Sequence, residues 1–161
     1  MKKKLAAGIL SMALAVGIVL PVSAADTKDL TVTYTQGESY VLSIPASAQG
    51  LNLSTTQDVT TDVGVTGVNL APGSKIQVSV TAGVDGSGVV KLTQTGGTAI
   101  LQSSLTLQET GAPVTLNQTF VEFTTDGSKT LNFSALKTQD NSQIKAGSYS
   151  GTITFSADIT P

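Results

Sequence analysis

The chain has 161 residues, of which only 12% are charged, and it contains no His, Cys or Trp. All nine basic residues are lysines, so the commonest general base, the thiolate nucleophile and the bidentate arginine clamp are all missing. Eleven acidic residues against nine lysines give a net charge of −2, and eleven against the six lysines that follow residue 24 give −5. This charge disfavours a nucleic-acid partner because phosphates would be repelled. Ser, Thr and Gly supply most of the polar character.

The first 24 residues have the pattern of a cleaved signal peptide. Three lysines follow Met1, an apolar run extends from Leu5 to Leu20, and Val22-Ser23-Ala24 places small residues where signal peptidase cleaves. Residues 25–161 are then expected to form a single domain with six lysines against eleven acids. Export without cysteine indicates a bacterial surface or extracellular protein that needs no disulfides.

After residue 24, apolar and polar residues alternate with the period of two that is typical of strands. Leu30–Tyr34 and Tyr40–Ile44 predict a hairpin that ends at Pro45. Asp58–Leu70 predicts a bent strand, and Ile76, Val78 and Val80 predict the buried face of the next one. The glycine-rich stretch from Gly83 to Gly88 predicts a tight connection.

The second half continues in the same way. Further strands are expected around Val90 and Leu92, around Leu105 and Leu107, and over 120–123, 130–135 and 148–159, and Asp126-Gly127 is a hairpin signal. In the last strand Tyr149, Gly151, Ile153, Phe155 and Ala157 should face inward, while the intervening Ser and Thr face water. Gly151 stands where a side chain is expected, which predicts a bulge or a close neighbour.

These elements predict an all-β protein, an antiparallel β-sandwich of immunoglobulin-like or Greek-key type with eight or nine strands. Closure into a barrel is the alternative that the pattern leaves open. No internal repeat or long linker divides residues 25–161.

Few residues suggest chemistry, and each has a structural interpretation beside the functional one. Ser142 and Lys145 have the S-x-x-K spacing of serine acyltransferases, but they precede a strand rather than lie on a helix. Glu122 with Asp126, or Asp58 with Asp62, are conceivable glycosidase carboxylates, although solvated charges at strand ends are the simpler interpretation. Asp85-Gly86-Ser87-Gly88 resembles a fragment of a calcium loop and is more simply a turn.

Other polar positions also have two interpretations. The tripeptides that begin at Asn52, Asn117 and Asn132 fit the N-glycosylation pattern, which Ser/Thr-rich sequences produce by chance. Tyr34, Tyr40 and Tyr149 would line a binding face or form the rim of the core. We therefore expect no catalytic residue, no cofactor and no metal site.

Several segments together resemble a group of small secreted proteins. Read in order, "SYVLSIPAS", "GSKIQVSVT", "VKLTQ", "SLTLQ", "LNFSA" and "AGSYSGTITFSADI" resemble small secreted β-sandwich surface proteins of Gram-positive bacteria. The ending is also distantly similar to WxL wall-binding domains, in which a Tyr strand runs into Trp-x-Leu. Tyr149–Thr154 fit that pattern, whereas Phe155 stands at the Trp position and Ala157 at the Leu position. The resemblance implies a sandwich fold at the cell surface.

The sequence therefore predicts a non-catalytic exported protein, secreted or associated with the cell wall, that acts in adhesion or wall association. Its expected partners are a cell-wall polymer, a glycan or a surface protein, with no nucleic acid and no membrane after signal cleavage. The alternative is a subunit of an extracellular fibre that self-associates through its terminal strands, with Asp26–Tyr34 as the donor.

Overall fold

The computed structural model describes residues 32–44 and 51–161. The expected signal peptide, residues 1–24, lies outside the described residues. Gln36–Pro161 form one compact unit, and the described residues before it, 32–35, belong to no strand. In the described part of the chain no helix has the length and apolar character needed to cross a membrane.

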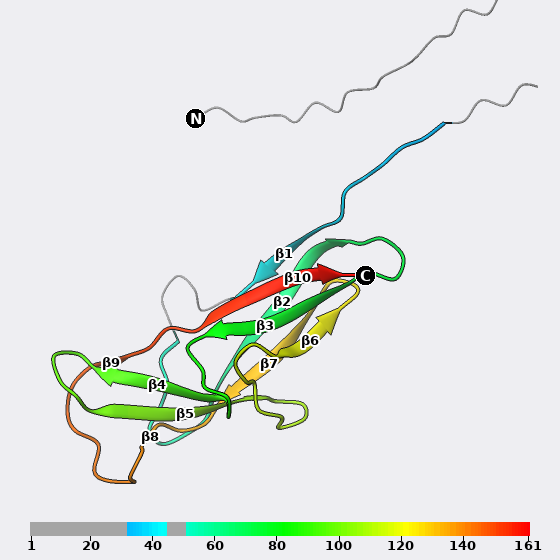
Figure 1. The fold of residues 1–161 in the computed structure, drawn as a ribbon. Coiled ribbons are helices and arrows are strands. Elements are labelled where there is room, and N and C mark those ends of the chain that lie inside the picture. Colours follow the sequence, from blue (N-terminus) through cyan, green and yellow to red (C-terminus); the bar gives the residue numbers. More distant parts are fainter. Residues whose placement is uncertain (1–31, 45–50) are drawn as a thin grey trace, which may run out of the picture. The chain divides into compact units, whose positions relative to one another are not determined.

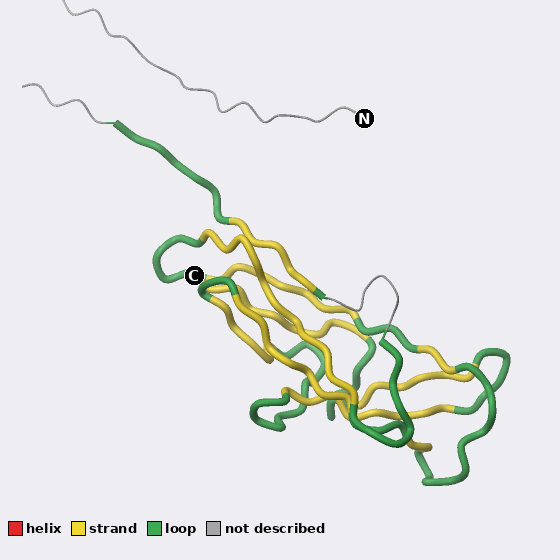
Figure 2. The backbone as a smooth tube through the Cα atoms, turned by 180° about the vertical axis from the view of Figure 1, so that it is seen from behind, coloured by secondary structure: helices red, strands yellow, loops and turns green. Residues whose placement is uncertain are grey.

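The described chain is all-β, as predicted, and every ladder between its strands is antiparallel (Figures 1 and 2). It has ten strands where eight or nine were expected. The strands are β1 (Ser39–Ser43), β2 (Val59–Asn69), β3 (Lys75–Ala82), β4 (Val89–Gln94), β5 (Ile100–Leu107), β6 (Thr119–Phe123), β7 (Gly127–Phe133), β8 (Lys137–Thr138), β9 (Tyr149–Ser150) and β10 (Thr154–Thr160).

The strands form two sheets. The large sheet has seven strands in the order β1-β2-β7-β5-β4-β9, with β8 paired to β5, and the small sheet has three in the order β10-β3-β6. Strand β8 is two residues long, which is too short for alternation to reveal it. The expected strand over 148–159 is divided into β9 and β10, and the described part of the strand expected at Leu30–Tyr34 is absent, so the count is ten.

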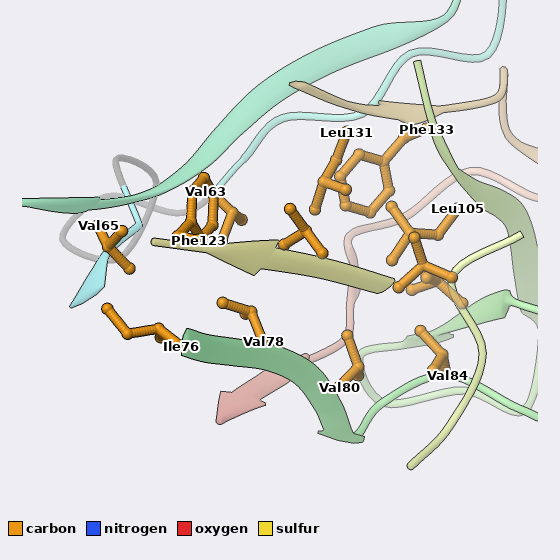
Figure 3. Packing of buried hydrophobic residues seen from close by; sticks show 13 residues of the cluster. Val63, Val65, Ile76, Val78, Val80, Val84, Leu105, Phe123, Leu131 and Phe133 are labelled. Carbon is orange, nitrogen blue, oxygen red and sulfur yellow. The ribbon is translucent and has the colours of Figure 1, made fainter. Parts of the chain in front are cut away.

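Both sheets contribute their apolar faces to one core (Figure 3). In β3, Ile76, Val78 and Val80 are fully buried and alternate with half-buried polar residues, because successive strand residues face opposite sides. Val63 on β2 and Leu105 on β5 close the same core from the large sheet. Burial of each such side chain stabilises the fold by about 1.5–3 kcal/mol.

The expected hairpin of Leu30–Tyr34 with Tyr40–Ile44 is wrong for its described part, since residues 32–38 carry no strand and β1 pairs with β2. The residues just before β1 are held by the end of β2 instead: the Glu38 carboxylate accepts the N–H of Ala71 at 2.7 Å, and the Asn69 amide donates to the Gly37 carbonyl. These contacts tie the entry of β1 to the end of β2.

The hairpin expected at Asp126-Gly127 is also wrong. The chain does reverse there, but β6 lies in the small sheet and β7 in the large one, so the turn arches between sheets. The Asp126 carboxylate accepts the N–H groups of Gly67 and Val68 on β2 rather than bonding within its own turn. Local turn chemistry was identified correctly, and its pairing partner was not.

The single last strand expected over 148–159 is divided. Tyr149–Ser150 pair with β4 in the large sheet, and Thr154–Thr160 pair with β3 in the small sheet. The prediction for Gly151 is confirmed as a close neighbour, because a Cβ atom there would lie 2.6 Å from the Lys91 carbonyl oxygen. Ile153, Phe155 and Ala157 pack against the core as expected. Tyr149 instead lines a groove at the surface.

Candidate functional site

Ser142 and Lys145 lie on the loop between β8 and β9, where they line an open groove of about 580 Å³. The rest of its lining comes from the start of β5 with the turn before it, and from the end of β8 with the loop that follows (Thr98, Ala99, Ile100, Thr138, Gln139, Asp140 and Gln143). No hydrogen bond joins the Ser142 hydroxyl to the Lys145 amine among the described contacts. Ser142 and Lys145 therefore line the same groove, but they lack the hydrogen bond by which a base activates a serine nucleophile.

Two hydrogen bonds shape the polar wall of the groove beside Asp140. The Ser142 N–H donates to the Asp140 carboxylate at 3.2 Å, and the Thr138 hydroxyl donates to the Ser142 carbonyl at 2.8 Å. Hydrogen bonds from the side chain and backbone of Ser142 hold the pKa of Asp140 below its ordinary value. Asp140 is therefore charged at neutral pH and serves to shape the loop.

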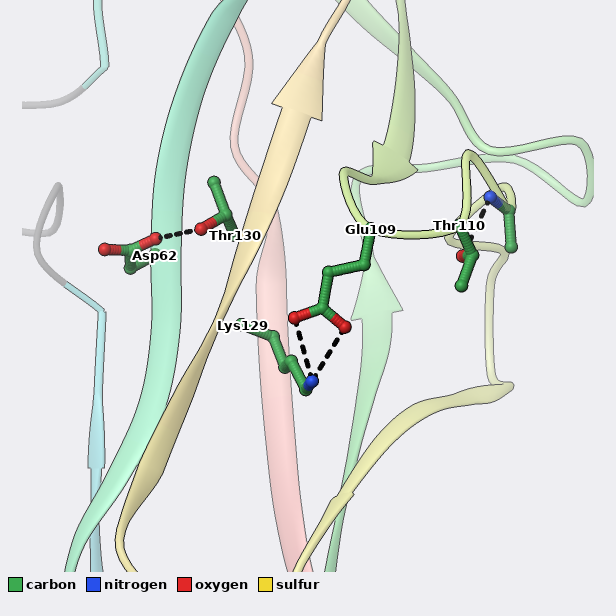
Figure 4. Close-up of polar contacts among 6 residues, drawn as sticks. Asp62, Glu109, Thr110, Lys129 and Thr130 are labelled. Carbon is green, nitrogen blue, oxygen red and sulfur yellow. Dashed lines mark hydrogen bonds and ion pairs between the residues drawn. The ribbon is translucent and has the colours of Figure 1, made fainter.

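Asp58 and Asp62 stand four residues apart at the start of β2, which separates them by about 13 Å along a strand. That distance exceeds the spacing of catalytic carboxylate pairs. The Asp58 carboxylate accepts the Asn132 amide at 3.0 Å and the Ala135 N–H at 3.0 Å, and these bonds lower its pKa. Asp62 accepts the Thr130 hydroxyl at 2.7 Å (Figure 4).

Glu122 and Asp126 are likewise committed to structural contacts. Glu122 on β6 forms an ion pair with Lys75 at 2.8 Å and accepts the Gln77 amide at 2.8 Å, and these partners on β3 lower its pKa. Asp126 is bound to β2 as described above. The two carboxylates serve different sheets, and nothing in their contacts pairs them.

The loop that resembles a calcium fragment forms a turn. The Asp85 carboxylate accepts the N–H groups of Val89 at 3.0 Å and Ser87 at 2.8 Å, and these bonds lower its pKa. Its lone pairs are directed at its own backbone, as in an Asx turn. Within residues 32–44 and 51–161, no three His, Cys, Asp or Glu side chains form a group that could hold a metal ion.

The three tyrosines do not share one face. Tyr34 precedes the first strand and is exposed, whereas Tyr40 on β1 packs against the core. Tyr149 on β9 donates its hydroxyl to the Lys145 carbonyl at 2.9 Å. Of the asparagines, Asn132 is held by Asp58, Asn117 adopts a positive φ of 57° in a turn, and Asn52 is exposed at the surface.

A second open groove, of about 470 Å³, was not anticipated from the sequence. Leucines from several separate segments line it together with Tyr149 (Leu51, Leu53, Leu92, Leu101 and Leu136). Ile144 and Lys145 border it, so the loop from 139 to 147 separates the two grooves. The alternation of Leu51 and Leu53 indicates in the sequence that these two side chains share one face. Nothing in the sequence shows which other segments they meet.

The two sheets also end beside each other. β1 is one edge of the large sheet and β10 is one edge of the small sheet. The Tyr40 hydroxyl of β1 donates to the Ala157 carbonyl of β10, so the two edges lie side by side (Figure 1). We call the region between β1 and β10 the seam.

A comparison of the chain with protein-family models, with curated proteins and with solved structures finds no match.

Proposed function

We propose that this protein is a non-catalytic, exported β-sandwich of immunoglobulin-like or Greek-key type that acts at the cell surface, in adhesion or cell-wall association. The observation that carries the proposal is that four of its carboxylates are already occupied by hydrogen bonds or ion pairs within the fold. Asp58, Asp85, Glu122 and Asp140 are all bound within the fold, and their pKa values are lowered. A general acid requires a raised pKa, so these groups are suited to structure rather than proton transfer.

The export pattern of residues 1–24 and the resemblance to secreted surface proteins support the cellular location. The expected partner is a wall polymer, a glycan or another surface protein. The groove beside Ser142 is the starting point for the search, because its neutral Thr, Gln and Ser side chains offer hydrogen bonds to a hydroxyl-rich polymer.

Co-sedimentation with purified cell walls tests this function. The chain from Ala25 onward should pellet with walls above the level of a control protein. The double variant Gln139→Ala, Gln143→Ala should reduce pelleting, whereas Gln118→Ala, an exposed glutamine on a turn away from the groove lining, should not. Failure of the unmodified chain to pellet counts against wall association.

A second function is favoured by a separate observation: a subunit of an extracellular fibre assembled by strand addition between chains. Val32 and Tyr34 are 83% and 85% exposed, in an alternating segment that belongs to no described strand. A strand added to another sheet pairs through its backbone and packs alternate side chains, and Val32 and Tyr34 have that spacing. Size-exclusion chromatography and negative-stain microscopy of the chain from Ala25 test it, since deletion of Asp26–Tyr34 should abolish any polymer.

A further inference from the structure

The seam joins two edge strands that carry few charges. β10 offers an edge of seven residues, β1 and β6 offer edges of five each, and β9 has only two. β1 carries no charged residue, and β10 carries only Asp158. Natural edges are normally blunted by charges, prolines or bulges because unpaired backbone groups attract further strands. Both seam strands have one irregularity near their start, at Ser39–Val41 and Thr154–Phe155, and the remainder of each edge is regular.

Apolar side chains of the core reach the surface along the seam. Tyr40 and Leu42 on β1, and Ala157 and Ile159 on β10, pack against the core but are only partly buried. The Tyr40 hydroxyl is the one described hydrogen bond that spans from β1 to β10. A strand laid along the seam would cover these four side chains and pair with unpaired backbone groups.

The segment that precedes β1 has the matching pattern. Val32 and Tyr34 have the same parity as Tyr40 and Leu42, the residues of β1 that face the core, while Thr33 and Thr35 alternate with them. Tyr34 and Ser39 are five positions apart, roughly 17 Å of extended chain, which is enough to reach an adjacent molecule. Its alternating apolar residues therefore suit a strand whose inner face packs against a core.

Resting on the fibre function above, we propose that Val32–Thr35 of one copy add as a strand to the seam of a second copy. Val32 and Tyr34 then face Tyr40, Leu42 and Ile159 of the acceptor, and Thr33 and Thr35 face solvent. The acceptor is a second copy of this chain because the pattern that fits the seam lies in the chain itself. Repetition of a head-to-tail contact whose rotation does not close into a ring produces a filament.

The first test asks which side chains of Val32–Thr35 face the acceptor, and it uses the chain from Ala25 as the starting material. Val32→Lys with Tyr34→Lys should abolish oligomers, because two ammonium groups would be buried at the seam. Thr33→Lys with Thr35→Lys is the matched control and should still assemble, since its added charges face solvent. All four residues are exposed, so thermal unfolding of the folded unit should be unchanged. Equal loss of oligomers in both variants overturns the proposed register.

Cysteine pairs give the second test, because the chain has no native cysteine. A chain carrying Thr33→Cys is mixed with a longer, tagged chain carrying either Val41→Cys or Asp158→Cys, on the solvent faces of β1 and β10. Mixed disulfides are expected under mild oxidation, and Glu122→Cys on the β6 edge should give at least tenfold less. Polymers that cross-link through Glu122→Cys instead would refute the seam as acceptor but leave the fibre intact. A chain that stays monomeric throughout removes both.

A double variant with Thr33→Cys and Asp158→Cys in the same molecule distinguishes strand addition between molecules from pairing within one molecule. If the segment covers the seam of its own chain, the disulfide forms within one molecule at all concentrations. The proposal requires the disulfide to link two molecules and to increase with protein concentration. An intramolecular product that is independent of concentration overturns it.

Discussion

The α-carbon of Gly83 and the backbone of Thr152 lie so close that no side chain fits between them. A Cβ atom on Gly83 would lie 2.7 Å from the α-carbon of Ile153 and nearer still to the Thr152 carbonyl oxygen. Gly83 follows β3, where the chain leaves the small sheet, and Thr152 lies between β9 and β10, where it returns to that sheet. The two crossings of the chain between sheets therefore contact each other directly.

Gly83→Ala should destabilise the fold for two reasons: the positive φ is strained for alanine, and the added Cβ would collide with the backbone of Thr152 and Ile153. The loss should therefore exceed the loss from the positive φ alone. Gly73 also has a positive φ, 94° against 89° at Gly83, but it has open space around its α-carbon. Gly73→Ala should therefore cost about 1–2 kcal/mol from strain alone. Chemical denaturation should show a clearly larger loss for Gly83→Ala. Equal losses would mean that the crossings separate readily.

Phe155→Ala tests whether the last strand faces the core as described. The ring packs against the core and meets Phe120 edge-on, with centroids 6.1 Å apart. Because the ring is only partly buried, we expect a loss of about 3 kcal/mol, at the low end for such truncations. Thr154→Ala, its exposed neighbour, should stay within about 0.5 kcal/mol. A negligible loss for Phe155→Ala would place the ring in solvent.

Tyr40→Phe removes the hydroxyl that joins the two edges of the seam. Loss of this hydrogen bond to the Ala157 carbonyl should reduce the free energy of unfolding by about 1 kcal/mol. Amide hydrogen exchange should increase in β1 and β10 and remain unchanged in β5 and β7. Burial and the charge of Asp158 both raise the pKa of Tyr40, so the hydroxyl retains its proton across the neutral range.

Acid should weaken the contacts that Asp58, just before β2, makes with Asn132 on β7 and with Ala135 after it. Its pKa is lowered in the folded state by Asn132 and by the Ala135 N–H, so the folded chain binds a proton less readily than the unfolded chain. The stabilisation is present above the ordinary value of 3.8 and is lost as the pH falls through the lower folded-state pKa.

The thermal midpoint measured against pH checks this. Asp58→Asn should show a smaller decrease of the midpoint on acidification than the unmodified chain, because the variant has no carboxylate to protonate. At neutral pH the variant should be the less stable of the two. Curves that run parallel through the acid range would show that Asp58 contributes nothing through its charge.

The ion pair of Lys129 with Glu109 should contribute little by itself. The amine contacts both carboxylate oxygens, at 2.9 and 2.7 Å, but both side chains are partly exposed (Figure 4). A double-mutant cycle with Lys129→Met and Glu109→Gln should give a coupling below about 1 kcal/mol. The coupling should decrease further at high salt, since solvent-exposed charges are screened. A coupling that salt leaves unchanged would contradict this account.

Candidate sites whose contacts are local could be predicted from the sequence, and those whose partners lie far along the chain could not. The sequence identified Asp85-Gly86-Ser87-Gly88 as a turn without help, because its hydrogen bonds run between neighbours. It did not reveal that Asp58 holds Asn132 or that Asp126 holds Val68, since those partners lie more than fifty positions away. The leucine groove beside Tyr149 was missed for the same reason, because its lining comes from segments brought together only by folding.

Alternation of apolar and polar residues was sufficient to predict an all-β chain and the inward face of most strands, including Ile76, Val78 and Val80 on β3 and Phe155 on β10. That information is local, because the period of two is set by the geometry of a single strand. Which sheet a strand joins depends on partners far along the chain. Only the tertiary structure therefore divided the strand expected over 148–159 at Gly151, placed β6 and β7 in different sheets, and brought β1 beside β10.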